Sequence, residues 1–585
     1  PLDAPGGEAR SLTQARNGAH SPAWSPDGTQ LAYLAPMRAE ERAKEDDPKQ
    51  EDEVPADKLA AKHAKDRRDQ DEKAWFDPVR VWRIPYREGT RYVDERYAQI
   101  YSIGTGENSE AKPRRLTNLD ADYSPPLWGA AGDYLYTSRA SQPDMDEPRF
   151  RSSAVYRIHV EDGREERITG DDVIAMGVRP APQGDWLAFM QRPRDSVVAE
   201  PFDLCVMPGD GGPATVLTRE HDRSIGEFVW DADGKSLVCT VAAQAVVTAR
   251  RISREGGSFE MLAAGQIHIT SLSVAPDGAV AFAASTPEQP SDVYVQTENA
   301  PEDFQKLTDI NADFLQEVIV QAPQLMPYEG EDGQALQGWY ILPVDYQAGQ
   351  QYPLALNIHG GPAAMWSIAE RSMWHEWQLH AARGYVVLAT NPRGSDGYGR
   401  DFRMANQGNW GPLPMSDVLH GVDTLLEKGF VDESRMAVTG GSYGGYLTAW
   451  IIGHSDRFAA AVAQRGVYNL LNFYGTSDVP ILISDTFGVE PWEDHVLLWE
   501  HSPVAYAHQI TTPLLIIHAE NDFRVPIAEA EHLFALVRRA TDTPVELWRY
   551  PRDGHEMSRS GEPQHRVSRL EKMVAWFDQY CRVPG

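Results

Sequence analysis

The sequence predicts a chain of two parts, an amino-terminal β-propeller domain over residues 1–330 and a carboxy-terminal α/β domain over residues 331–585. Two observations lead to this prediction. Before residue 325, a strand–turn–strand pattern recurs at intervals of about 50 residues. From Gln334 onward, apolar strands alternate with helical segments, which is typical of a mostly parallel sheet covered on both faces.

The repeat in the first part is clearest at 23–34, where the sequence AWSPDG precedes an apolar strand. Units of about four short strands at this spacing indicate the blades of a propeller. The first interval is about twice as long as the others, so it contains either a missing blade or a large insertion. We predict six or seven blades. Weaker copies of the pattern occur at 128–136, 181–189, 230–238 and 275–281.

The long interval contains a charged insertion at about 37–98. Glu, Asp, Lys and Arg dominate its first half, 37–73, which predicts a solvated segment, either without fixed structure or an exposed helix. A flap over the propeller or an oligomer contact is the functional alternative. The following stretch, 80–87, is rich in arginine and aromatic residues, and its role stays open.

The second part is organised around residues 435–452. A short apolar strand at 436–438 leads into GGSYG at 440–444, and a helical pattern follows. Gly-x-Ser-x-Gly between a strand and a helix is the sequence form of a nucleophile elbow, which predicts an α/β-hydrolase domain. Ser442 is therefore the predicted nucleophile, held at the positive end of the helix.

A base and an acid follow the serine in the order that this fold requires, Ser, then Asp or Glu, then His. The strand at 513–518 ends just before Glu520 and Asp522, and the strand at 545–550 ends just before His555. We predict Asp522 as the residue that orients the base and His555 as the base. Two alternatives stay open: Glu520 is the acid, or Asp522 caps the helix that follows.

An oxyanion site is predicted from two segments. The strand at 354–358 leads into HGGP at 359–362, in the position of the loop that donates one oxyanion N–H. The other donor is the residue after the nucleophile. We assign the backbone N–H groups of Tyr443 and Gly361. His359 precedes the nucleophile, so we expect a structural hydrogen bond there and not a catalytic role.

The whole chain resembles the prolyl oligopeptidase family of serine peptidases, most closely its acylaminoacyl-peptidase branch. The resemblance rests on HGGP at 359–362, NPRGS at 391–395, GGSYGG at 440–445, NDFRVP at 521–526 and GH at 554–555. It implies hydrolysis of short peptides through an acyl-enzyme, with the propeller restricting access by longer chains. It also implies no cofactor, and homo-oligomers are common in the family.

Substrate specificity is less clearly encoded. Arg465 follows the strand at 458–464 and is expected either to form a structural ion pair or to bind a peptide carboxylate through two hydrogen bonds. Arg393 has the same chemistry, but its loop is expected to be structural. An apolar pocket or ordinary core packing explains the apolar side chains of the next segment equally well. These are Leu471, Phe473, Tyr474 and Ile481.

The resemblance to the acylaminoacyl-peptidase branch implies an exopeptidase of that type. A carboxypeptidase or small oligopeptidase that uses an arginine to bind the peptide C-terminus is the alternative. A dipeptidyl aminopeptidase would need paired acids near the site, and Glu165 and Glu166 are the pair available. An esterase and a non-catalytic propeller interaction protein are weaker alternatives.

Composition limits partners and compartment. The net charge is −31 over 585 residues, which argues against nucleic acid and anionic membranes as partners. No apolar run is long enough to span a bilayer. Three cysteines imply no disulfide framework and a cytoplasmic, reducing location, although the first residue is not Met, which leaves a removed leader open.

Two segments imitate metal sites. Residues 231–234 resemble the start of a calcium loop but lack its closing carboxylate, and the histidines of 375–380 are five apart and face different sides of a helix. We therefore predict no metal site.

Overall fold

The computed structural model describes residues 12–46, 56–84, 86–105, 112–141, 149–296 and 303–582. The contacts between residues divide the chain into two compact units. The first comprises 1–86, 93–195 and 204–217, and the second comprises 87–92, 196–203 and 218–585. Each unit is described by itself, and the boundary at residue 330 between the predicted domains remains a prediction.

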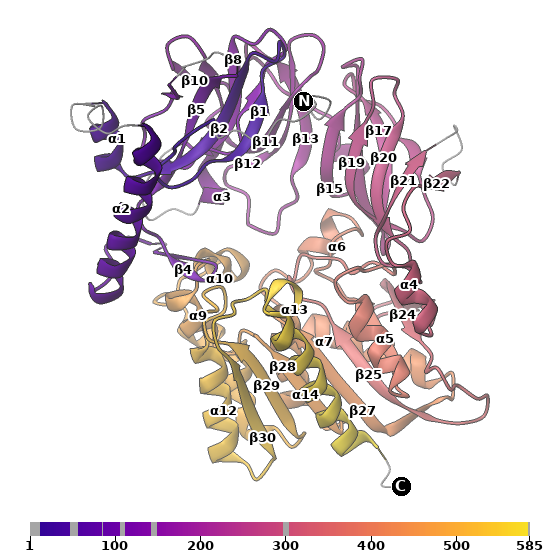
Figure 1. Cartoon of the computed structure of the whole chain (residues 1–585). Coiled ribbons are helices and arrows are strands. Elements are labelled where there is room, and N and C mark those ends of the chain that lie inside the picture. Colours follow the sequence, from indigo (N-terminus) through magenta and orange to yellow (C-terminus); the bar gives the residue numbers. More distant parts are fainter. Residues whose placement is uncertain are drawn as a thin grey trace. The chain divides into compact units, whose positions relative to one another are not determined.

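The first unit is built from four-stranded antiparallel sheets, the expected form of propeller blades (Figure 1). The sheet β1-β2-β5-β6 contains β1 (His20–Trp24), β2 (Gln30–Met37), β5 (Tyr97–Gly104) and β6 (Arg114–Arg115). The sheet β10-β9-β8-β7 contains β7 (Leu127–Trp128), β8 (Tyr134–Ala140), β9 (Ser153–His159) and β10 (Glu165–Arg167), with α3 (Arg149–Ser152) before β9. The third sheet contains β11 (Val173–Pro180), β12 (Trp186–Pro193), β13 (Asp203–Pro208) and β14 (Thr215–Val216).

The turns of the repeat explain its sequence pattern. At the first copy, Gly28 has φ 73°, a conformation that favours glycine, and its N–H donates to Ser25 O at 2.9 Å. The Asp27 carboxylate accepts from Thr29 N at 3.0 Å and holds the other side of the turn. The Asp-Gly pair thus closes the hairpin between β1 and β2.

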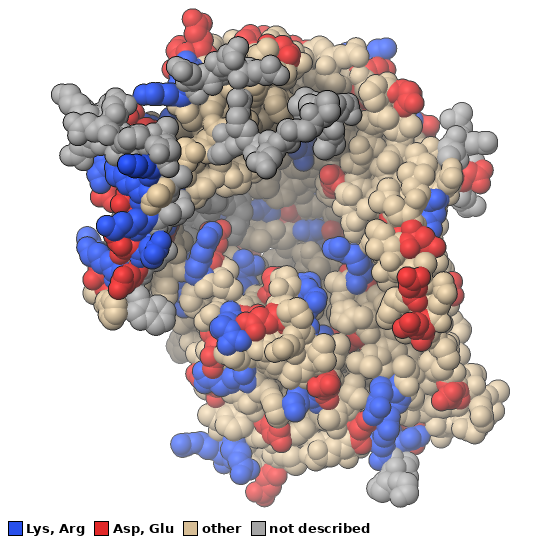
Figure 2. Space-filling model, viewed as in Figure 1, with Lys and Arg blue, Asp and Glu red and all other residues tan. Residues whose placement is uncertain are grey.

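The long interval of the repeat is an insertion into one sheet, because β2 and β5 pair directly from Gln30↔Gly104 to Met37↔Tyr97. The insertion carries two helices, α1 (Ala39–Asp46) and α2 (Ala56–Phe76). Lys and Arg side chains lie beside Asp and Glu side chains over these helices (Figure 2). The insertion also carries the short hairpin of β3 (Arg87–Glu88) and β4 (Arg91–Tyr92), which belongs to the second unit.

The second unit contains further propeller strands. They are β15 (Ile225–Trp230), β16 (Ser236–Ala243), β17 (Val246–Ser253), β18 (Glu260–Ala263), β19 (His268–Val274), β20 (Val280–Ser285), β21 (Asp292–Gln296) and β22 (Phe304–Lys306), flanked by the 3-10 helix η2 (Arg219–His221) and by α4 (Ala312–Glu317). They form two more four-stranded groups, joined by one parallel pairing, Val247↔His268. The described strands do not establish the predicted count of six or seven blades, which stays a prediction.

The rest of the second unit is an α/β-hydrolase domain, as expected. Its eight-stranded sheet has the order β23-β24-β26-β25-β27-β28-β29-β30. All pairings from β26 to β30 are parallel, and β23 and β24 are antiparallel. The strands are β23 (Gln324–Glu329), β24 (Ala335–Ile341), β25 (Tyr352–Ile358), β26 (Val386–Asn391), β27 (Val431–Gly441), β28 (Ala460–Gln464), β29 (Leu514–Ala519) and β30 (Val545–Tyr550).

Helices cover both faces of this sheet (Figure 1). They are α5 (Trp374–Ala382), α6 (Arg400–Met404), α7 (Pro412–Leu426), α8 (Tyr443–His454), α9 (Leu470–Thr476), α10 (Ile481–Phe487), α11 (His495–Glu500), η3 (Pro503–Gln509), α12 (Ala528–Ala540), α13 (Met557–Ser560) and α14 (Pro563–Cys581). Successive residues of β27 alternate between faces: Val438 packs in a core with α7, α8 and α12, whereas Ala437 packs against α14. Because the strands are parallel, the ends of β25, β27, β28, β29 and β30 meet at one edge, where the predicted site residues lie.

No helix among the described residues combines the length and apolarity that crossing a membrane requires. The three cysteines, Cys205, Cys239 and Cys581, are buried free thiols.

Candidate active site

The turn between β27 and α8 has the geometry of a nucleophile elbow. Ser442 has φ 62° and ψ −125°, a strained conformation for a residue with a side chain. Its neighbours must be small: a Cβ on Gly440 would lie 2.5 Å from Gly444 O, and one on Gly444 would overlap Ile358 O. The two glycines therefore let β27 turn directly into α8 while Ser442 occupies the apex.

Ser442, His555 and Asp522 form one hydrogen-bonded chain. His555 Nε2 lies 3.0 Å from Ser442 Oγ, and His555 Nδ1 lies 2.7 Å from Asp522 Oδ2. The three residues come from loops after β27, β30 and β29, and all three loops open at the same edge of the sheet. This chain of contacts allows the imidazole to accept the serine proton while the carboxylate holds the ring.

Burial and neighbouring charges set the protonation of this chain. Burial lowers the pKa of His555, although the Asp522 carboxylate opposes this shift. Burial by itself raises the pKa of Asp522, but the charge and hydrogen bond of His555 outweigh it and hold that pKa below its usual range. A neutral imidazole beside an ionised carboxylate is the arrangement that general-base catalysis needs.

The two acids that the sequence left open have different contacts. Glu520 lies at an exposed position and pairs with Arg549, whose Nε is 3.2 Å from Glu520 Oε1. Asp522 Oδ1 accepts from Val525 N at 2.8 Å, so the acid also braces its own loop while its other oxygen faces His555. The sequence did not draw attention to His518, which is fully buried, with its Nε2 3.6 Å from Asp522 Oδ2 and 2.7 Å from Val525 O.

The loop after β25 lies beside the nucleophile. A Cβ on Gly360 would lie 3.0 Å from Gly441 O and 3.2 Å from Ser442 Cβ, so a larger residue here would crowd the nucleophile. His359 makes the structural contacts expected of it, with Nε2 2.8 Å from Ser395 Oγ. Gly361 lines the pocket beside Ser442, and Tyr443 is the first residue of α8, where a backbone N–H has no partner within the helix.

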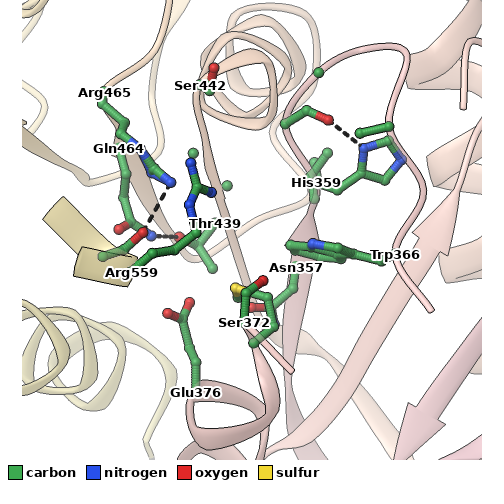
Figure 3. Close-up of a pocket in the computed structure, with 18 of the residues that line it drawn as sticks. Asn357, His359, Trp366, Ser372, Glu376, Thr439, Ser442, Gln464, Arg465 and Arg559 are labelled. Carbon is green, nitrogen blue, oxygen red and sulfur yellow. Dashed lines mark hydrogen bonds between the residues drawn. The ribbon is translucent and has the colours of Figure 1, made fainter. Parts of the chain in front are cut away.

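A pocket of about 260 Å³ opens beside Ser442 and His555. It extends beneath the elbow toward α5 and α14, and Glu376 of α5 lies at its far end. Figure 3 shows Arg465, Gln464 and Arg559 on one side and Trp366 on the other. The pocket combines positively charged, polar and aromatic groups within reach of the nucleophile.

The predicted specificity residues divide between two places. Arg465 lines this pocket, whereas the predicted apolar residues of α9 and α10 do not. Phe473 is 1% exposed and belongs to the core, and Leu471 and Tyr474 pack against the same core. Ile481 is half-buried at the start of α10. Their role in binding substrate remains a prediction.

The pocket also contains residues that the sequence analysis missed. Arg569 of α14 is 1% exposed, with Nη2 2.6 Å from Glu376 Oε2 and Nη1 2.8 Å from Gln464 Oε1. One signal was present. The apolar pattern of 564–580 predicts an amphipathic helix at the end of the chain, and Arg569 lies four residues before Met573 on its apolar face. A lone arginine on an apolar face needs a buried acceptor.

The hairpin of β3 and β4 contacts the loop that carries Asp522. Phe523 N donates to Gly89 O at 3.2 Å, and the guanidinium of Arg87 lies 5.0 Å from the centre of the Phe523 ring. Gly89 N donates to Asp478 Oδ2 at 3.2 Å, which ties the hairpin to the loop after α9. The end of the arginine-rich segment thus packs beside the candidate acid.

Two other charged groups that the sequence singled out have partners. Arg393 is paired with the fully buried Asp417, Nη2 to Oδ1 at 2.6 Å, as expected of a structural loop. In the first unit, Glu165 accepts from Tyr123 Oη at 2.7 Å and Glu166 accepts from Arg157 Nη2 at 2.6 Å. Both acids considered for binding a peptide amino-terminus therefore already have hydrogen-bond partners.

Among the described residues, one group has the geometry of possible metal ligands, namely Asp553, Glu562 and His565. These residues already form hydrogen bonds with each other and with the side chain of Arg552. His565 Nδ1 lies 2.8 Å from Asp553 Oδ2, and Arg552 Nε lies 2.7 Å from Glu562 Oε1. The segment that imitates a zinc helix instead uses Glu376 to bind Arg569.

Comparison with known proteins supports the family. The sequence profile of the prolyl oligopeptidase family matches residues 371–583. The uncharacterized peptidase YuxL of Bacillus subtilis is 32% identical, over 98% of this chain and 85% of the relative. A dipeptidyl-peptidase 5 of Porphyromonas gingivalis is 27% identical over 82% of this chain and 69% of its own.

Acylaminoacyl-peptidases are also among the similar proteins, as the sequence motifs predicted. The human acylamino-acid-releasing enzyme is 26% identical over 70% of this chain and 59% of its own. The uncomplexed Pyrococcus horikoshii acylaminoacyl peptidase has the same fold, with a TM-score of 0.81 at 22% identity over 98% of this chain and 84% of its own. This chain therefore belongs to the prolyl oligopeptidase family of serine peptidases.

Proposed function

We propose that the protein is a serine exopeptidase of acylaminoacyl-peptidase type, in which Ser442 is the nucleophile, His555 the base and Asp522 the residue that orients it. The observation that carries the proposal is the contact of His555 Nε2 with Ser442 Oγ at 3.0 Å, in line with the contact of His555 Nδ1 with Asp522. The similarity to acylamino-acid-releasing enzymes supports the choice of substrate class.

The reaction follows from these contacts. His555 takes the Ser442 proton as the hydroxyl attacks the scissile carbonyl, and it then gives that proton to the departing amine. The backbone N–H groups of Tyr443 and Gly361 are the proposed donors to the oxyanion. Water next attacks the acyl-enzyme with His555 again as base, which releases the acylated amino acid and restores Ser442.

A single short peptide with an apolar residue at each end tests the proposal. It is prepared with both ends free, with an acetylated N-terminus, with an amidated C-terminus, and with both ends blocked. Mass spectrometry identifies the products, and Ser442→Ala is the control. Release of the acetylated first residue, only from the acetylated forms, is expected. Equal cleavage of all four forms would indicate an oligopeptidase instead.

A dipeptidyl-peptidase is the second candidate, because relatives that match over most of this chain carry that name. The same peptide experiment distinguishes a dipeptidyl-peptidase from an acylaminoacyl-peptidase. Such an enzyme would cleave only the two forms with a free N-terminus and would release a dipeptide. Comparing turnover of matched ester and amide substrates addresses the weaker esterase alternative.

The expected cytoplasmic location and homo-oligomeric state remain proposals. Size-exclusion chromatography with light scattering measures the mass of the particle against 65.2 kDa for one chain.

A further inference from the structure

Arg465 is a buried arginine that lies beside the nucleophile. Arg465 follows β28 and is 7% exposed, and among the described residues no carboxylate forms an ion pair with its guanidinium. Its Nη2 donates to Ser558 Oγ at 3.0 Å, and its Nε is buried with no hydrogen-bond partner. Burying a cation without a counter-ion is costly, so such an arginine calls for a functional explanation.

The other charges of the pocket do not neutralise Arg465. Glu376 is committed to Arg569 through the 2.6 Å ion pair. Glu556, next to His555, is committed to Arg559. Asp522, whose charge also acts on Arg465, is hydrogen-bonded to His555 and to Val525 N. Among the described residues, none of these carboxylates forms an ion pair with Arg465, whose guanidinium lines the pocket.

The position of Arg465 is set by its backbone. Its N–H donates to Ile517 O at 2.8 Å, and it has φ 39°, a conformation that is unusual for a residue with a side chain. The guanidinium packs against the backbone of Gly441, since a Cβ at that residue would overlap Arg465 Nη1. Gly441 directly precedes Ser442, so the charge lies within about one residue of the reacting bond.

Arg465 remains a cation under working conditions. Burial lowers its pKa to about 10, and the positive charges of Arg559 and Arg569 act in the same direction. The guanidinium therefore stays protonated at neutral pH and presents N–H donors to the pocket (Figure 3).

We propose that Arg465 binds a carboxylate of the substrate that lies next to the scissile bond. The guanidinium is the side chain that best matches a carboxylate, since it offers two parallel N–H donors. A pocket of about 260 Å³ has room for one terminal residue or one side chain. The carboxylate is either the free C-terminus of a departing residue or the side chain of an acidic residue at the cut. This inference rests on the proposed peptidase function.

Two pairs of N-acetylated peptides test it. The first pair differs only in a free or amidated C-terminus one residue after the cut. The second pair is amidated at the C-terminus and differs only in Asp or Asn beside the cut. The ratio of kcat/KM within each pair is compared between the wild type, Arg465→Gln and Arg465→Lys. Arg549→Gln is the control, because it removes an arginine whose side chain is 44% exposed and whose acidic partners are also exposed.

The wild type is expected to favour the carboxylate member of one pair by about ten- to a hundredfold, as for a charge-assisted hydrogen-bonded pair. The ratio of kcat/KM within that pair should fall to nearly one in Arg465→Gln, take an intermediate value in Arg465→Lys and be unchanged in Arg549→Gln. Loss in the first pair identifies the terminal carboxylate, and loss in the second identifies the acidic side chain. A wild type without preference in either pair, or an unchanged preference in Arg465→Gln, overturns the inference.

A binding measurement separates this inference from the proposed function. Calorimetry compares the affinity of Ser442→Ala for the acid and the amide member of each of the two peptide pairs, with and without the Arg465→Lys change, which keeps a cation should Arg465→Gln fail to fold. Tighter binding of the acid that depends on Arg465 supports the carboxylate site even if no peptide is turned over. Equal affinity for acid and amide overturns it, even if the enzyme proves to be an active peptidase.

Discussion

Arg569 of α14 and Glu376 of α5 form a 2.6 Å ion pair in which each residue is 1% exposed. The pair joins two helices on the same face of the sheet, beneath the pocket beside Ser442. Burial by itself raises the pKa of Glu376, but the positive charge of Arg569 outweighs it and keeps that pKa below its usual range. Removing one partner of such a pair destabilises the fold, because the other is left as a buried charge without a counter-ion.

Glu376→Gln should therefore lower the free energy of unfolding by about 3 to 5 kcal/mol, because it leaves Arg569 as an uncompensated buried charge. Urea denaturation measures the change. The matched control is Glu531→Gln, which removes an exposed partner of Arg549 and should alter stability by less than about 0.5 kcal/mol. Similar effects of the two substitutions would contradict the structural role of the pair.

Asp522→Asn should lower kcat by about 10⁴-fold, because the amide no longer holds the tautomer of His555 that accepts the serine proton. Glu520→Gln changes the neighbouring acid in the same way, but Glu520 contacts Arg549 and not His555, so activity should change less than about twofold. Steady-state kinetics on an acetylated peptide give both values. A larger loss in Glu520→Gln would instead make Glu520 the catalytic acid.

The acid limb of the kcat/KM profile should have its midpoint below pH 6.5, the ordinary value of histidine. Burial lowers the pKa of His555, so the neutral, active form persists as the pH falls to 6.5 and is lost only below it. Rates measured between pH 4.5 and 8, with circular dichroism to monitor folding, locate this midpoint. A midpoint above 6.5 would mean that the Asp522 charge outweighs burial.

Gly444→Ala should abolish activity and destabilise the fold, because its Cβ would overlap Ile358 O and push the elbow away from β25. Gly475→Ala is the same substitution in α9, where no atom lies within 4 Å of the added Cβ. It should preserve activity and raise stability by up to about 1 kcal/mol, since alanine loses less backbone entropy in a helix. Thermal unfolding and peptide turnover of both variants test the contrast.

Elements with strong local patterns were predicted well. The segments 436–444 and 564–580 have patterns that depend on neighbours within a few residues, and the structure has β27 leading into α8 there and α14 at Pro563–Cys581. The sequence also predicts a helix over 417–427 ahead of the elbow. Helix α7 begins earlier, at Pro412, because proline fits the first turn, where its missing N–H costs nothing. Blade number could not be read in the same way, since it depends on pairing between distant strands.

By itself, the sequence determined the elbow and the order of Ser442, Asp522 and His555, because each occupies a loop defined by its adjoining strand. Only the tertiary structure decided which charged groups meet. Glu376 and Arg569 are 193 residues apart in the chain, and their pairing depends on two helices packing on one face of the sheet. That pairing commits Glu376 to Arg569, and among the described residues no carboxylate forms an ion pair with Arg465, whose Nη2 donates to Ser558 Oγ instead.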